Sequence, residues 1–216
     1  MVRKILAEIP PEQLERDLKR YNQLALDMGA TNAAIITADK VIIDERVRAK
    51  CIYPKCRWYG TSITCPPHAP DVDFTRRLVS KFHYAILFRI EVPSELTVWK
   101  GKTDEQKEES ARYSKMRSGI IAKIESTAFY DGYYLAMGFG GGPCKSMFCP
   151  TDEICQALLP GKGCKHPFAT RASMEGMGMD VFLMVARVGW DIYPFGMALT
   201  KDDVPCAVRV GMIFIY

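Results

Sequence analysis

The sequence predicts a single α/β or α+β domain, in which helices flank a mixed sheet and two cysteine-rich loops leave the ends of strands. Two observations lead to this expectation: segments with helical periodicity alternate with β-rich segments, and most cysteines fall in two short stretches. The 216 residues fit one large domain spanning 1–216, and the 48% of hydrophobic and 25% of charged residues are ordinary globular values.

Four segments are expected to form helices. The first opens at Pro10 and Pro11, continues with apolar residues at helical spacing from Leu14 to Met28, and ends at Gly29. The others are a short helix capped by Asp71 or Asp73 and reaching Lys81, a long helix over Asp104–Phe129, and a helix capped by Ser173 that carries Met174, Met177 and the run Asp180–Val188.

Five segments have the composition of strands. The most distinct is Tyr84–Val92, which reads YAILFRIEV and combines β-branched with aromatic residues. The others are Ala33–Thr37, Val41–Ile43, Tyr133–Phe139 and Ala207–Ile215. Both cysteine-rich loops follow strand candidates, and loops at the ends of strands are common places for functional sites.

The charge and hydropathy patterns exclude two classes of protein. The net charge of +4 is spread along the chain without a dense Lys/Arg block, which argues against nucleic-acid binding. No segment reaches about 18 uninterrupted apolar residues, and the N-terminus is soon charged, so neither a membrane span nor a signal peptide is expected. We therefore expect a cytoplasmic protein.

Seven of the eight cysteines lie in two loops, and Cys206 stands alone. A reducing cytosol keeps thiols free, so clustered cysteines there more often bind metal or carry out redox chemistry than form disulfides. The first loop holds Cys51, Cys56 and Cys65, and the second holds Cys144, Cys149, Cys155 and Cys164.

The second loop has the spacing C-x4-C-x5-C-x8-C, which supplies four thiolates from one segment. Four thiolates are sufficient for a tetrahedral ion or for a 4Fe–4S cluster. Structural zinc sites favour tight C-x2-C pairs, which this loop lacks, so the spacing favours the cluster and leaves zinc as the alternative. The glycines Gly140–Gly142 are expected to let the backbone wrap closely around a bulky group.

The first loop has the spacing C-x4-C-x8-C, which leaves a cluster one ligand short. The open position suits a substrate, a ligand from a partner, or a fourth residue of this chain. His68, three residues after Cys65, and the isolated Cys206 are the candidates for that fourth ligand. The seven cysteines belong either to two separate sites or to one shared site.

Two polar residues near the second loop, Arg171 and His166, have two interpretations each. Within Thr170–Asp180, Arg171 either donates hydrogen bonds to a cluster or an anion, or pairs with a nearby carboxylate. Ser173 is expected to cap a helix. His166, two residues after Cys164, either orients a metal ligand or lies on the surface.

Three stretches together resemble a family of prokaryotic proteins described as predicted metal-binding proteins. They are VRAKCIYPKCRWYGTSITCPPHAP, GFGGGPCKSMFCP and CKHPFATRASMEGMGMDVF, which occur in the same order as in the family. The resemblance runs from about Val41 to the C-terminal strand. It implies metal binding, with iron–sulfur the favoured chemistry, at Cys51, Cys56, Cys65, Cys144, Cys149, Cys155 and Cys164.

Two functions remain open at this point. The first is an iron–sulfur protein with one or two 4Fe–4S clusters, which transfers electrons to a redox partner protein and fits a component of an oxidoreductase. The second is a non-catalytic adaptor that zinc stabilises or that carries metal. The sequence has no GxSxG, HExxH or GxGxxG motif, so hydrolase and dinucleotide-binding activities lack support.

Overall fold

A computed structural model describes residues 2–97, 102–194, 200 and 202–216. Its four strands form one sheet in the order β1-β2-β4-β3. They are β1 (Asn32–Thr37), β2 (Tyr84–Val92), β3 (Met137–Phe139) and β4 (Ala207–Phe214). All three ladders between these strands are antiparallel. Within the described residues, parallel pairing is limited to an isolated bridge between Gly140 and Ser173.

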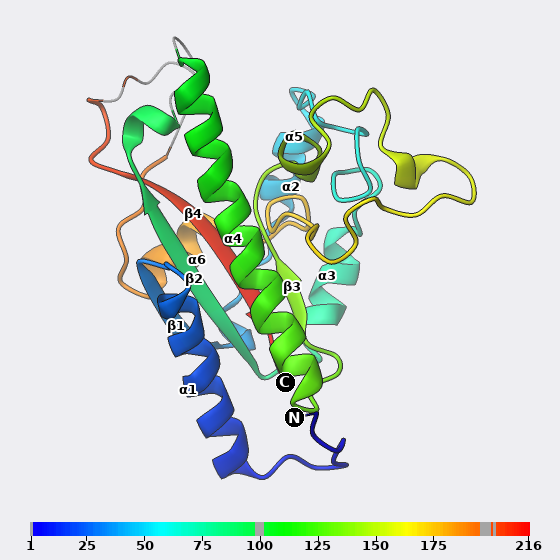
Figure 1. Cartoon of the computed structure of the whole chain (residues 1–216), viewed down its shortest axis with the longest axis vertical. Helices are drawn as coiled ribbons and strands as arrows, with labels where there is room; N and C mark the ends of the chain where they lie inside the picture. Colours follow the sequence, from blue (N-terminus) through cyan, green and yellow to red (C-terminus); the bar gives the residue numbers. More distant parts are fainter. Residues whose placement is uncertain (1, 98–101, 195–199, 201) are drawn as a thin grey trace.

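The α-helices lie around this sheet, which confirms the α/β fold class (Figure 1). They are α1 (Pro11–Asp27), α2 (Glu45–Ile52), α3 (Val72–Val79), α4 (Asp104–Tyr130), α5 (Cys144–Phe148) and α6 (Val181–Arg187). Short 3-10 turns occupy η1 (Ala38–Lys40), η2 (Ser94–Leu96) and η3 (Gln156–Leu158). Helices α1 and α4 cross one face of the sheet side by side, and α6 lies behind it. No helix of the described ranges has the length and apolarity to cross a membrane.

Several predicted boundaries are confirmed by identifiable capping contacts. Asp71 caps α3, because its carboxylate accepts a hydrogen bond of 2.7 Å from the Phe74 amide. Thr103 and Gln106 form a capping box at the start of α4. Strand β2 has the predicted bounds, and β4 ends one residue before the predicted Ile215.

The segment after β1 differs from the prediction. Val41–Ile43 does not form a strand, and only Ile43 makes an isolated bridge, with Met179. Asp44 follows at once and caps α2 by accepting a hydrogen bond of 2.8 Å from the Arg46 amide. The sequence did not predict α2, which carries Cys51 in its last turn.

Two other predictions were too long. Tyr133–Phe139 is a strand only from Met137, because the residues before it form a turn in which the Ala136 amide donates to the Tyr133 carbonyl at 2.9 Å. The helix expected from Ser173 begins at Val181 and is capped by Asp180. The residues before it form tight turns that include Gly178 with a φ of +84°, a conformation outside the helical region.

The central strands present alternate side chains to two cores. From β2, Ile86 and Phe88 pack with α1 and α4 on one face. Ala85 and Leu87 pack on the other face, against α6 and buried methionines that include Met174. Because both faces are covered, the sheet is a rigid support for the loops at its end.

Helix α4 approaches the sheet closely because two strand positions are glycine. A Cβ atom added to Gly211 would lie 2.4 Å from Phe88 Cζ and 3.0 Å from Ile121 Cδ1. A Cβ atom added to Gly138 would lie 2.2 Å from Ile121 Cγ2. Ile121 therefore packs α4 directly against the sheet. The same contact sets the position of Arg117, which lies one helical turn earlier.

The Gly211→Ala variant is expected to lose about 1–3 kcal/mol of unfolding free energy, because the new methyl group collides with the enclosed Phe88. The control is Gly119→Ala on α4, where an added Cβ has no atom within 4 Å. Alanine there should raise the unfolding free energy by up to about 1 kcal/mol through helix propensity. Urea unfolding measures both, and equal stability of the two variants would contradict the close contact.

Candidate metal centre and the adjoining cavity

The first cysteine loop is folded into successive turns after α2. The Cys56 amide donates to the Cys51 carbonyl at 3.1 Å, and the Ala69 amide donates to the Cys65 carbonyl at 3.0 Å. Cys65 is buried, whereas Cys51 and Cys56 are half-buried. These turns hold the three thiols in one neighbourhood although thirteen residues separate Cys51 from Cys65 in the sequence.

Burial and neighbouring groups shift the pKa values of the thiols in the first loop. Burial raises the pKa of Cys51, and the neighbouring Cys56 and Cys65 thiols raise it further. Burial also raises the pKa of Cys65, while hydrogen bonds from the Ser62 and Thr64 side chains act in the opposite direction. The site is therefore enclosed and also supplies hydroxyl donors to sulfur.

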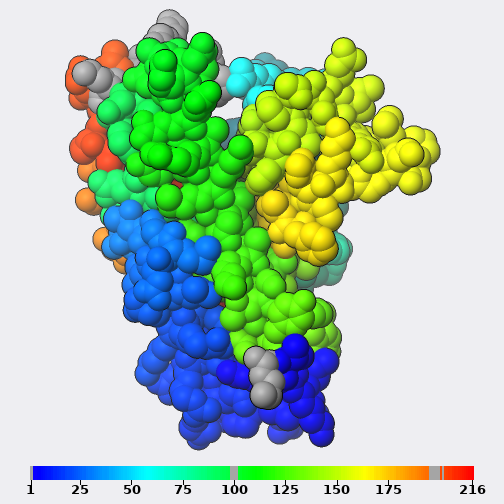
Figure 2. All heavy atoms as spheres, in the orientation of Figure 1, coloured from blue at the N-terminus to red at the C-terminus, as the bar shows by residue number. Residues whose placement is uncertain are grey.

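The second loop has little regular structure. Cys144 is buried at the first position of α5, and Cys149 ends that helix. Cys155 is half-buried immediately before η3. Cys164 is half-buried, and its sulfur accepts a hydrogen bond of 3.3 Å from the His166 amide. The part of the loop after residue 150 projects from the side of the molecule (Figure 2).

The two loops meet at Cys144. The Thr64 hydroxyl of the first loop donates a hydrogen bond of 2.9 Å to the Cys144 sulfur. Cys144 also contributes to the raised pKa of Cys65, after burial. Within its own loop, Cys144 and Cys164 contribute to the raised pKa of Cys149, for which burial is again the largest cause. Cys144 therefore lies between the first loop and the rest of the second.

Three arginines anchor these loops to the scaffold. Arg48 on α2 donates to the carbonyls of Ala69 at 3.1 Å and Gly176 at 2.5 Å. Arg117 on α4 donates to the Gly141 carbonyl at the start of the second loop. Arg171, after that loop, makes a two-pronged ion pair with Glu125 of α4 at 2.6 and 2.8 Å.

The other residues singled out in the sequence lie elsewhere or act differently. His68 is exposed. Burial is the largest cause of the raised pKa of Cys206, and the charged groups that act on it are Glu91, Arg89 and Asp191 rather than residues of either loop. His166 contacts Cys164 through its backbone amide. For Arg171, the interpretation as the partner of a carboxylate is confirmed.

The thiols are free and are not arranged around a single ion. All eight cysteines lack disulfide bonds. Among the described residues, no three His, Cys, Asp or Glu side chains are placed as ligands of one metal ion. Gly140 and Gly141 pass beside Arg117, and a Cβ atom at Gly141 would lie 3.1 Å from its Nη1 atom.

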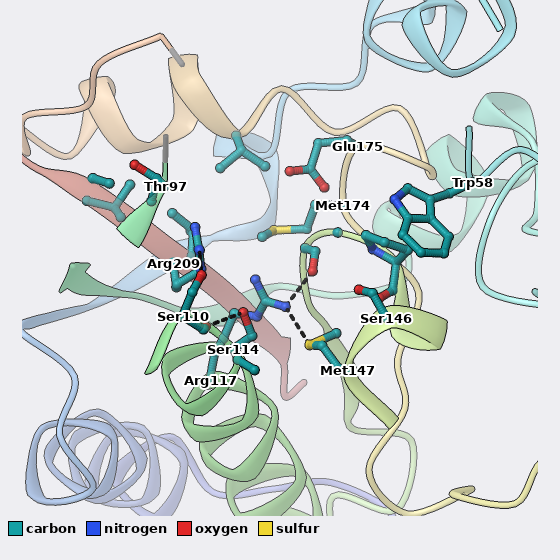
Figure 3. Close-up of a pocket in the computed structure, with 18 of the residues that line it drawn as sticks. Trp58, Thr97, Ser110, Ser114, Arg117, Ser146, Met147, Met174, Glu175 and Arg209 are labelled. Atoms are coloured by element: carbon teal, nitrogen blue, oxygen red, sulfur yellow. Dashed lines mark hydrogen bonds between the residues drawn. The ribbon is translucent and has the colours of Figure 1, made fainter. Parts of the chain in front are cut away.

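A cavity of about 920 Å³ lies between α4, β4 and the two cysteine loops (Figure 3). The first loop contributes Trp58, and the second contributes Pro143 and Met147 to its wall. Arg117 and Arg209 point into it from α4 and β4. No sequence pattern predicts this cavity, because its walls come from segments distant along the chain.

The α/β scaffold thus carries free, partly buried thiols on two loops that meet at Cys144. Residues 34–214 match the model of the family described as predicted metal-binding protein (DUF2284), and the chain belongs to this family. The resemblance found in the cysteine motifs is thereby confirmed. No curated protein and no solved structure matches the chain.

Replacing Arg171 with Ala is expected to lower the unfolding free energy by about 1–3 kcal/mol, because both Glu125 oxygens lose charged donors in a partly buried site. The matched control is Arg112→Ala on α4, whose pair with Glu109 is largely exposed and is expected to contribute under about 1 kcal/mol. Denaturant unfolding gives both values. Limited proteolysis should also cleave the second loop faster in the Arg171 variant only. Equal effects of both variants would show that the pair does not anchor the loop.

Proposed function

We propose that the cysteine-rich region binds iron–sulfur clusters and that the protein transfers electrons in the cytoplasm. The observation that carries this proposal is the contact between the two loops. The Thr64 hydroxyl donates a hydrogen bond to the Cys144 sulfur, and Cys144 contributes to the raised pKa of Cys65. A bound cluster supplies one-electron transfer. The eight free thiols also fit a reducing compartment.

The surroundings of the sulfur atoms support a cluster. Hydrogen bonds to sulfur and burial are the means by which proteins tune a cluster's potential. Here the Thr64 hydroxyl donates to Cys144, the His166 amide donates to Cys164, and both Cys65 and Cys144 are buried. The residues present therefore fit a thiolate-bound group of this kind.

The neighbours of Cys144 favour a ligand grouping that sequence order does not suggest. Cys144 would complete the first loop's set as the fourth ligand with Cys51, Cys56 and Cys65. This assignment is supported by the Thr64 hydrogen bond and by the exposure of His68, the other nearby candidate. The incomplete set is then Cys149, Cys155 and Cys164, on the loop that projects from the molecule.

The same projecting loop supports docking of a redox partner protein. Its exposed apolar side chains include Ile154, 60% exposed, and Leu159, 43% exposed, and Phe168 shortly after the loop is 85% exposed. Large apolar side chains at the surface are typical of interaction sites when they gather in one region. A partner on this loop would lie beside the Cys149, Cys155 and Cys164 set.

The cluster and its ligand grouping are tested on protein purified without oxygen, by measuring iron, zinc and acid-labile sulfide. Iron with matching sulfide is expected. Cys51→Ser and Cys144→Ser should each remove one cluster's worth of iron, and the double variant should lose no more than either one. Combining Cys144→Ser with Cys149→Ser should remove both clusters. The control Cys206→Ser should leave the iron content unchanged.

Two results would contradict parts of this account. Zinc without sulfide would remove the iron–sulfur proposal and favour the zinc-stabilised module. If the Cys144→Ser, Cys149→Ser double variant lost no more iron than Cys144→Ser, Cys144 would belong with the second loop, and the first set would need another fourth ligand.

A further inference from the structure

The geometry points to a second site in this protein: the cavity between α4, β4 and the cysteine loops binds a small organic anion. Arg117 and Arg209 hold the anionic group, a carboxylate or a phosphate ester, and the apolar walls hold the rest of the molecule. This inference does not depend on which metal the cysteines bind.

Arg117 is the strongest evidence, because it is a buried cation that forms no ion pair with an acidic side chain among the described residues. The residue is 4% exposed. Its Nη2 atom donates to the Gly141 carbonyl and lies 3.7 Å from Met147 Sδ, but its Nε atom has no hydrogen-bond partner among the described residues. Burial lowers its pKa to about 10. A guanidinium is costly to bury without an anion, so the missing partner is expected to be a ligand.

Arg209 adds a second guanidinium to the same cavity. It donates to the Ser110 hydroxyl at 3.1 Å, and its buried Nε atom also has no partner in the described part of the chain. After burial, Arg209 is the next cause of the lowered pKa of Arg117, so the two cations lie close enough to repel each other. An anion between them would relieve this repulsion and complete both sets of hydrogen bonds.

Glu175 does not replace that anion. It faces the arginines across the cavity (Figure 3), and its buried Oε2 atom has no hydrogen-bond partner among the described residues, although its charge opposes the lowering of the Arg117 pKa. Burial raises the pKa of its carboxyl group, which favours the neutral form. It is the one acidic residue of the described lining, against the basic residues Arg57, Lys102, Lys107, Arg117 and Arg209.

The walls and size indicate an organic molecule rather than a bare ion. The volume of about 920 Å³ is within the usual range of small-molecule sites. Apolar side chains that include Trp58, Met174 and Val181 contribute to the lining. Such walls favour a ligand with an apolar body, oriented by the two cations at one end.

The cavity also adjoins the cysteines. Glu175 is close enough to contribute to the raised pKa of Cys51, for which burial is the largest cause. Pro143, directly before Cys144, belongs to the wall. A ligand in the cavity would therefore lie against both cysteine loops.

Binding is tested on the metal-loaded protein by calorimetry, with phenylacetate, 3-phenylpropionate and phenyl phosphate as probes. Phenylacetamide and 3-phenylpropionamide are the neutral controls, and inorganic phosphate is the control without an apolar body. At least one organic anion should raise the unfolding temperature and bind measurably, while its neutral counterpart should do neither. The probe that binds identifies the preferred anionic group.

The variant that tests the residues is Arg209→Gln, which leaves the contact between Arg117 and Gly141 in place. It should weaken binding of that probe about ten- to a hundredfold, the value expected for one charged hydrogen bond. The control Arg112→Gln, on the exposed face of α4, should bind as the wild type does. Failure of every organic anion, equal binding of the neutral probes, or equal binding of inorganic phosphate would overturn the proposal. So would unchanged affinity in a folded Arg209 variant.

Discussion

The buried guanidinium of Arg117 connects the sheet, the long helix and the cysteine-rich region. It reaches the Gly141 carbonyl because Gly140 and Gly141 carry no side chains in its way. Its position is set one turn later, where Ile121 seats α4 on Gly138 and Gly211. This contact therefore helps to fix the start of the second loop, and Arg117 also lines the adjoining cavity.

The irregular loops are held by the hydrogen bonds of their own turns and by side-chain contacts with the helices. Arg48 fixes the end of the first loop and Arg171 fixes the end of the second. Arg48 reaches loop carbonyls from α2, and Arg171 reaches a carboxylate of α4, so each loop is joined to a helix at a defined point. This arrangement suits a site whose ligands come from loops and whose support comes from a two-sided core.

The sequence was a good guide wherever local chemistry decides the structure. Tyr84–Val92 was predicted correctly because a β-branched, aromatic run is buried on both faces, and the start of α4 follows from its capping box. Helix α2 was missed because it is short and lies beside the cysteines. The turns before α6 were read as helix because their methionines have helical spacing, although Gly178 adopts a positive φ.

The candidate site was predictable only in part, for the same reason. The cysteine spacing predicts which seven thiols are candidate metal ligands. The approach of Cys144 to Thr64 cannot be predicted in this way, because it depends on tertiary packing. Arg117 and Arg112 are indistinguishable in a charged helix, yet one is buried and the other is exposed. The two arginines differ because Gly140 and Gly141 run along the face of α4 that carries Arg117.

In the proposed arrangement, the two loops form one metal-binding region joined at Cys144. X-ray diffraction from crystals of protein kept free of oxygen, measured on both sides of the iron absorption edge, tests it most directly. The account predicts an anomalous iron peak bounded by Cys51, Cys56, Cys65 and Cys144. An iron peak bounded only by the second loop's cysteines, or no iron at Cys65, would contradict it.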